Sequence, residues 1–384
     1  MTTTNGHPPF GTARELFDIP GHVAYFNTAS LAPTLRTARD AGEAALRRRA
    51  QPWRIRTADW FDGAEERRSL FAGIIGATAD DIALVPATSY GLAVAAANLN
   101  PPAGSRILVL DGEYPSGVYT WWRLAERTGA SLLTVRREPG ATWTEAVLGA
   151  LDGAVALVCV PQVHWTDGAL LDLEPIARAA RAAGAAFVVD ASQSAGAVPL
   201  DVGVLRPDFL VSVGYKWLLG PFGLGYLYAS PAHHQGRPLE ENWILRAGSE
   251  DFAGLVDYRS DYQPGARRFD AGGRTAFELT PMAVAALRQL SAWTVPAVAG
   301  ALSAVTARIE EEARKRALPT PAPRGPHMLG IAVPEELRGR VAARLEAAEV
   351  FVGVRGASIR ISPHLHTTDE DVERLFDALD GALA

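Results

Sequence analysis

The sequence predicts an α/β protein with a mostly parallel sheet in a large domain and a smaller α+β domain at the C-terminal end. Between about residues 80 and 230, short apolar runs alternate with amphipathic segments of helical periodicity. Strands that are apolar on both faces and separated by helices are typical of parallel sheets covered by helices. After residue 230 this alternation stops, and the chain of 384 residues is long for a single core.

Six strands and four helices are expected in the first part. The strands are expected at 81–88, 105–111, 130–135, 153–162, 185–192 and 207–214, and the helices at 89–99, 116–129, 143–153 and 173–184. Ligands of such sheets bind beyond the carboxyl ends of the strands. Polar residues lie at or just past these ends, and we therefore expect the site among Thr88, Glu113, His164, Asp190 and Lys216.

The second part begins with a loop-rich stretch at 233–255 and a long helical segment at about 280–316. A strand, a helix, a second strand and a final helix follow at 327–334, 335–350, 358–363 and 368–383. We expect a large cofactor-binding domain over 31–265, a small C-terminal domain over 266–384, and an N-terminal segment, 1–30, that joins the small domain.

Composition argues against several classes of function. A formal net charge of −6 gives no electrostatic reason to bind nucleic acid. The sequence has no apolar run of about 18 residues and no signal-peptide pattern at its start, so we expect no membrane partner and a cytoplasmic protein. The single cysteine, Cys159, excludes an internal disulfide framework. The histidines at 233–234 and 364–366 lack a cluster of carboxylates or cysteines, so no metal is expected.

Lys216 lies in an apolar, glycine-rich segment, VSVGYKWLLGPFGLG, where an unpaired ammonium is costly or has a lowered pKa. Asp190 directly follows an apolar strand. The two residues form a buried ion pair, or they are the two fixed groups that pyridoxal 5'-phosphate (PLP) needs. In that case the lysine forms an imine with the aldehyde, and the carboxylate keeps the pyridine nitrogen protonated. Thr88 and Ser89 cap the helix at 89–99 in either case, and its N-terminus suits a phosphate.

The central motifs, VVDASQSAG and GYKWLLGPFGLG, together resemble those of the class V aminotransferase family of fold type I PLP-dependent transferases. That family includes cysteine desulfurases, kynureninases and isopenicillin-N-epimerase-like proteins. The resemblance extends from YFNTASLAP at Tyr25 to IRISPHLHTTDEDVERL near the C-terminal end. It implies a PLP-dependent enzyme that acts on an amino acid, and a homodimer with its active site at the interface.

The resemblance also implies a role for each matching residue. Lys216 is the catalytic residue that forms the imine, and Asp190 pairs with the ring nitrogen. The other cofactor contacts are Thr88, Ser89 and Tyr215 at the phosphate, Gln193 at the ring oxygen or the imine, His164 and Trp165 near the ring oxygen, Tyr114 on the ring face, and Thr275 of AGGRTAF reaching the partner's phosphate. Asn27 and Arg360 contact the substrate, the latter as a fork onto its carboxylate. The alternatives are core aromatics for Tyr114 and Trp165, a structural histidine for His164 and a surface strand residue for Arg360.

The residues leave the reaction open. Lys216 is the natural base for the α-proton, and an aminotransferase-like or β-eliminating (C–S lyase type) enzyme is the leading hypothesis. Amino-acid epimerisation and a non-catalytic protein of the same fold are the alternatives. A nicotinamide oxidoreductase is disfavoured because GPFGLG has the wrong spacing. Cys159 lies in an apolar strand and cannot act as a mobile thiolate, so we expect no persulfide on this protein.

Overall fold

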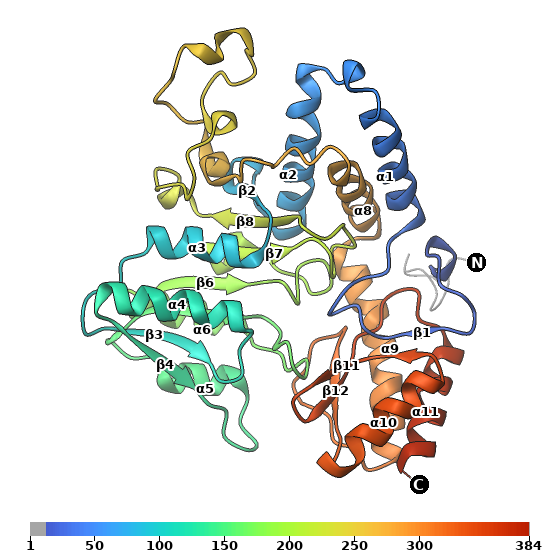
Figure 1. The fold of residues 1–384 in the computed structure, drawn as a ribbon. Helices are drawn as coiled ribbons and strands as arrows, with labels where there is room; N and C mark the ends of the chain where they lie inside the picture. Colours follow the sequence, from blue (N-terminus) through green and yellow to red (C-terminus); the bar gives the residue numbers. More distant parts are fainter. Residues whose placement is uncertain (1–12, 384) are drawn as a thin grey trace.

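A seven-stranded sheet forms the centre of the larger part of the molecule (Figure 1). The computed structural model describes residues 13–383. In spatial order the strands are β2 (Ile82–Val85), β8 (Gly225–Ala229), β7 (Phe209–Val213), β6 (Ala186–Asp190), β5 (Val155–Pro161), β3 (Arg106–Leu110) and β4 (Ser131–Val135). Only β8 runs in the direction opposite to the other six strands. The predicted α/β class with a mostly parallel sheet is confirmed.

Strand β8 is not among the six expected strands. It begins at Gly225, the last residue of the glycine-rich segment after Lys216, and that segment reads as a loop because glycine weakens strands. Gly225 is needed for close approach instead, since a Cβ there would come within 2.9 Å of the Ser212 carbonyl oxygen. The chain therefore returns directly from the lysine segment into the sheet.

Different helices cover the two faces of the sheet. Alternate residues of β3 serve the two faces, so Ile107 packs with α3 (Thr88–Asn98) and α4 (Pro115–Thr128), whereas Leu108 belongs to the opposite cluster. The helices that contribute to that opposite cluster are α2 (Asp62–Ile75), α5 (Trp143–Ala150), α6 (Leu173–Ala182), α7 (Val202–Leu205), α8 (Leu279–Trp293) and α9 (Val295–Lys315). The four helices expected between the strands are all present.

The segment expected to be helical at about 280–316 is helical, but it is divided into two helices. Helix α8 ends at Trp293, and α9 (Val295–Lys315) leaves at 79°. Thr294 separates them with φ = 64°, and its side chain accepts a hydrogen bond from the backbone N–H of Ala297. Pro296 lies in the first turn of α9, where a missing N–H costs nothing. Among residues 13–383, no single helix is long and apolar enough to span a membrane, and this bent pair meets those criteria only when both helices are counted together.

A three-stranded antiparallel sheet lies in the C-terminal part, in the order β11 (Gly353–Arg355), β12 (Ser358–Ile361) and β9 (Leu329–Ala332). Helices α9, α10 (Glu335–Ala347) and α11 (Asp369–Leu383) share its apolar core. The short strand β1 (Ala24–Tyr25) pairs in parallel with β10 (Val350–Phe351), so the N-terminal segment lies beside this sheet (Figure 1). The domain boundaries at 30/31 and 265/266 stay predictions.

The remaining elements lie mostly at the surface. Helix α1 (Arg36–Arg49) packs beside α8, and the stretch between β8 and α8 projects from the body as an extension (Figure 1). The short 3₁₀ helices are η1 (Arg14–Leu16), η2 (Pro52–Arg54), η3 (Thr57–Trp60), η4 (Ala79–Asp81), η5 (Pro231–His233), η6 (Trp243–Leu245), η7 (Ala253–Val256) and η8 (Gly265–Phe269).

Candidate active site

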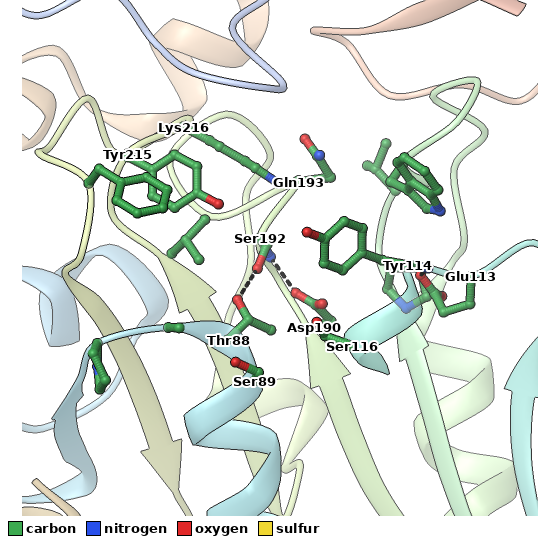
Figure 2. Close-up of a pocket in the computed structure, with 17 residues that line it drawn as sticks. Thr88, Ser89, Glu113, Tyr114, Ser116, Asp190, Ser192, Gln193, Tyr215 and Lys216 are labelled. Carbon is green, nitrogen blue, oxygen red and sulfur yellow. Dashed lines mark hydrogen bonds between the residues drawn. The ribbon is translucent and has the colours of Figure 1, made fainter. Parts of the chain in front are cut away.

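A pocket opens at the carboxyl ends of the parallel strands, where the sequence places the polar residues (Figure 2). Of the five residues expected at these ends, four line it and His164 does not. The residues lining the pocket are Pro86, Ala87, Thr88, Ser89, Glu113, Tyr114, Ser116, Pro161, Val163, Trp165, Asp190, Ser192, Gln193, Val213, Tyr215, Lys216 and Phe222. We call Thr88, Asp190, Ser192 and Lys216 the pocket floor.

Lys216 enters the pocket from a tightly folded turn after β7. The N–H of Gly220 donates to the Gly214 carbonyl at 2.8 Å, and a Cβ at Gly196 would lie 2.6 Å from the Trp217 carbonyl oxygen. The Nζ of Lys216 lies 5.7 Å from the centre of the Tyr114 ring (Figure 2). Burial is the main cause that lowers the pKa of Lys216 to about 8, and the nearby charge of Asp190 opposes the shift. In a substantial fraction of molecules, Lys216 is therefore neutral near pH 8 and able to act as a nucleophile or base.

Asp190 ends β6 and is held by the turn that follows. Its Oδ1 accepts a hydrogen bond of 2.9 Å from the backbone N–H of Ser192. Burial raises the pKa of this carboxyl, while the hydrogen bonds from Ser192 and the charge of Lys216 lower it. The Ser192 hydroxyl lies 2.9 Å from Thr88 Oγ1, so one short network joins the end of β6 to the start of α3 (Figure 2).

The N-terminus of α3 opens onto the floor without a side-chain cap. The prediction that Thr88 and Ser89 cap this helix is wrong, because Ala87 is the N-cap and Thr88 is the first helical residue. The Thr88 hydroxyl is near Ser192 rather than a backbone N–H of its own helix. Uncapped N–H groups and a helix dipole favour an anion at this place. Ser89 is exposed and lines the same opening.

Gln193 connects the floor to more distant parts of the chain. Its side-chain oxygen accepts from Trp217 Nε1 at 2.9 Å, and its Nε2 donates to the carbonyl of Ala29 at 3.1 Å. His327 Nε2 contacts the Gln193 carbonyl oxygen at 2.6 Å and packs edge-on against Trp217. Gln193 therefore fixes the residue after Lys216 as well as lining the pocket, and the contact expected for it with the ring oxygen or the imine stays a prediction.

The aromatic residues of the pocket form its side wall. Tyr114 and Trp165 meet edge-to-face with centroids 5.4 Å apart, and Tyr215 lies against Phe222. His164 lies outside the pocket lining, stacked on Trp143 at 5.1 Å with Nδ1 2.7 Å from Thr166 Oγ1. The structure thus brings three of the four expected aromatic contacts to the pocket and leaves His164 behind the wall.

Two expected residues, Asn27 and Arg360, are not among the residues that line the pocket. Arg360 of β12 is 1% exposed and donates to the Trp165 carbonyl and to Ser30 Oγ, each at 2.7 Å. A second guanidinium, that of Arg355 in β11, donates to the same Ser30 oxygen at 3.1 Å. We call Ser30, Arg355 and Arg360 the rim. The Asn27 side-chain oxygen is buried and has no hydrogen-bond partner in the described part of the chain.

Thr275 is not brought to this pocket. Its hydroxyl donates to the Trp60 carbonyl at 2.9 Å, and the side chain is buried inside its own subunit. Ser212 is also buried and donates to the Val213 carbonyl. The contact of Thr275 with a partner's phosphate stays a prediction.

Several lining residues have no role in the sequence prediction. Ser192 stands two residues after Asp190 in DASQSAG, so the motif could have indicated it. Glu113 was expected among the polar residues at the strand ends, but no contact or role was assigned to it. Its Oε1 accepts from the Tyr114 backbone N–H at 2.7 Å, and burial raises its pKa to about 7.

Ser30 and Arg355 give no local signal, because they meet only through the packing of β11 against the N-terminal segment.

Comparison with known proteins identifies the family. The profile of the aminotransferase class-V family matches residues 54–375, so the chain belongs to that family. It is 28% identical over 326 residues to the uncharacterized aminotransferase YcbU of Bacillus subtilis, covering 84% of this chain and 85% of that protein. It is also 28% identical to the isopenicillin N epimerase of Streptomyces clavuligerus, covering 82% and 83%. The family resemblance drawn from the two motifs is confirmed.

Solved structures agree on the fold. A variant of the cystine C-S lyase C-DES with glycine covalently linked to its PLP cofactor superposes with a TM-score of 0.86, covering 95% of this chain and 98% of that one at 21% identity. The expectations of fold type I and of a PLP-dependent enzyme of this family are confirmed.

The residues of the pocket fit PLP. The uncapped N-terminus of α3 with the Thr88 hydroxyl suits the phosphate, and Lys216 supplies an amine with a lowered pKa for the aldehyde. Asp190 is a carboxylate at the end of a neighbouring strand, and Tyr114 offers an aromatic face across from Lys216. A donor set of this kind holds a phosphate, an aldehyde and a protonated ring nitrogen without a metal ion.

Proposed function

We propose that this protein removes the α-proton of an α-amino acid with Lys216 and completes either a transamination or a β-elimination. The observation that carries the proposal is that Lys216, Asp190 and the uncapped N-terminus of α3 meet in one pocket (Figure 2). When bound, PLP supplies an electron-accepting ring that acidifies hydrogen on the substrate's α-carbon.

The protein's own residues supply the remaining steps. The Nζ of Lys216 accepts the α-proton, for which its pKa of about 8 is suited near neutral pH. Asp190 is the carboxylate that pairs with the cofactor's ring nitrogen, and Arg360 holds the substrate's carboxylate. The wall formed by Tyr114 and Trp165 limits the approach of water to the reacting atoms.

A spectral titration of the purified protein tests the proposal. The PLP-loaded enzyme is titrated with a panel of amino acids and S-substituted cysteines, and keto acids, pyruvate and ammonia are assayed. A keto acid without ammonia, with the cofactor left in its amine form, identifies a transaminase. Ammonia with pyruvate and a restored spectrum identifies a β-lyase. No spectral response to any amino acid would refute the proposal.

Epimerisation is a second candidate, favoured by the relative that is named isopenicillin N epimerase. It requires that the α-proton return to the opposite face of the same carbon. A spectral response without keto acid, pyruvate or ammonia, together with loss of optical rotation, identifies this outcome.

We also propose that the active unit is a homodimer. The family resemblance supports it, and so does Phe222, which lines the pocket although the residue is 70% exposed. Large apolar side chains exposed beside a site often mark an interface. Size exclusion with light scattering in the presence of PLP should give twice the mass of one chain, and a monomer at all concentrations contradicts the assembly.

A further inference from the structure

The two rim arginines lie on one face of the β11–β12 hairpin. Antiparallel pairing sets Arg355 opposite Ser358 and Arg360 opposite Gly353, so the two arginines are diagonal neighbours on the same side. Gly353 leaves room for the Arg360 side chain, because a Cβ at this position would come within 3.2 Å of Arg360 Nε and Nη2. Both guanidinium groups then reach the hydroxyl of Ser30.

No acidic side chain balances the rim. Within residues 13–383, neither Arg355 nor Arg360 has a carboxylate within salt-bridge distance, although neighbouring Arg137 pairs with Asp167. Burial and the charge of Arg355 lower the pKa of Arg360 to about 9, and both arginines lower the pKa of Lys216. Leaving a buried cation such as Arg360 without a counter-ion is costly, and the half-buried Arg355 adds a second positive charge beside it, so the rim suits anions.

A single carboxylate of a ligand pairs with only one of the two rim arginines. A fork of two parallel hydrogen bonds joins a carboxylate to one guanidinium, and Arg360 is the buried member with a free Nε. Arg355 is also held in place, since Nη1 donates to the Val354 carbonyl at 2.7 Å and its guanidinium lies 5.8 Å from the Trp165 ring centre. Arg355 is therefore a second, ordered cation beside the first.

We propose that the substrate of this enzyme is an amino acid with a second acid group in its side chain, and that Arg355 binds that group while Arg360 binds the α-carboxylate. Arg355 is thus a specificity-determining residue. This inference rests on the proposed function, because it takes the pocket floor as the place where the substrate's α-carbon reacts.

Calorimetric titration of the PLP-loaded enzyme with unreactive diacids tests the assignment without any turnover. The probes are succinate, glutarate and adipate, each compared with its own monoamide, which keeps the length and removes one charge. The diacid of matching length should bind roughly ten-fold more tightly than its monoamide. Arg355→Gln should abolish this preference while leaving monoamide binding unchanged, and Arg355→Lys should retain part of it. Arg340→Gln, on the exposed side of α10, makes the same change in net charge as a control.

Three results would overturn the inference. They are equal binding of diacids and monoamides by the unmodified enzyme, equal weakening of both by Arg355→Gln, and loss of the diacid preference in Arg340→Gln. Equal weakening would mean that both arginines hold a single carboxylate. Failure of the proposed function has a different signature, since the enzyme would then show no spectral response to amino acids whatever its preference among diacids.

Discussion

The floor and the rim of the pocket differ in how their charges are balanced. On the floor, Lys216 has Asp190 close enough to raise its pKa against the effect of burial, and Asp190 also has hydrogen bonds from Ser192. On the rim, Arg355 and Arg360 share a serine hydroxyl, and no carboxylate of the described chain pairs with them. The floor is thus a site whose protein charges compensate each other, whereas the charges of the rim are not compensated within the described part of the chain.

This difference assigns the two regions different tasks. A compensated lysine and aspartate can keep their positions before and after substrate binds, which suits a resident cofactor. Uncompensated arginines gain most when an anion arrives, which suits a substrate that must be released again. Changing the floor should therefore abolish the chemistry, whereas changing the rim should alter affinity and selectivity.

Replacement of Lys216 by alanine should produce the largest effect. Loss of the group that attaches the cofactor and moves the α-proton should reduce turnover by at least about 10³-fold. Borohydride reduction followed by denaturation measures covalent attachment independently of activity. The sequence has two lysines, and the other, Lys315, is exposed at the end of α9 and bonded to Glu312. Lys315→Ala should keep the attached cofactor, and attachment that survives in Lys216→Ala would show that the lysine is wrongly assigned.

Replacement of Arg360 by glutamine should have the next largest effect, and it should appear in binding. Removing a buried charged donor costs about 2 kcal/mol, which is roughly thirty-fold in the KM of an amino acid. Covalent attachment of PLP should stay intact, because Arg360 is hydrogen-bonded to Ser30 and the Trp165 carbonyl and not to a residue of the floor. A variant with unchanged KM but lost cofactor attachment would reverse the roles given to the two regions.

The pH dependence of cofactor attachment shows how the rim acts on the floor. Only the neutral amine of Lys216 attacks an aldehyde, so the attachment rate should rise about ten-fold per pH unit below pH 8 and level off above its pKa of about 8. The charge of Arg360 lowers that pKa, so Arg360→Gln should move the levelling point to higher pH. Stopped-flow absorbance of the apoprotein mixed with PLP measures both profiles, and identical profiles would mean that the two regions are electrostatically independent.

The same contrast explains what could be predicted from the sequence. The floor is encoded by short motifs at strand ends, so Lys216, Asp190 and Thr88 could be found by reading along the chain. The strands themselves were predictable because β5, β6 and β7 are apolar on both faces. The cap of α3 was not, since Thr88 follows the capping position by one residue and its hydroxyl turns to Ser192.

Of the rim, only Arg360 was predicted, because it lies in the family-like segment IRISP, whereas Ser30 and Arg355 could not be found in this way. Ser30 meets Arg355 and Arg360 across more than 300 positions of sequence, and that contact depends on β1 pairing with β10. The bend at Thr294 was also not predicted, because the apolar pattern continues across the break between the two helices. Both cases depend on tertiary packing that local sequence patterns do not report.

Replacement of Cys159 should give the smallest effect, because a buried residue close to the site need not take part in the reaction. The thiol lies inside β5, 5% exposed, and burial raises its pKa well above the ordinary value. A thiol that stays protonated and cannot move is a poor nucleophile. Cys159→Ala should therefore keep full turnover and lose about 1 kcal/mol of stability, the usual cost of removing one small buried group. Kinetics, denaturant unfolding and mass spectrometry after incubation with cysteine measure the three quantities. A persulfide on Cys159, or turnover that falls with unchanged stability, would place a reactive sulfur in a strand whose packing argues against it.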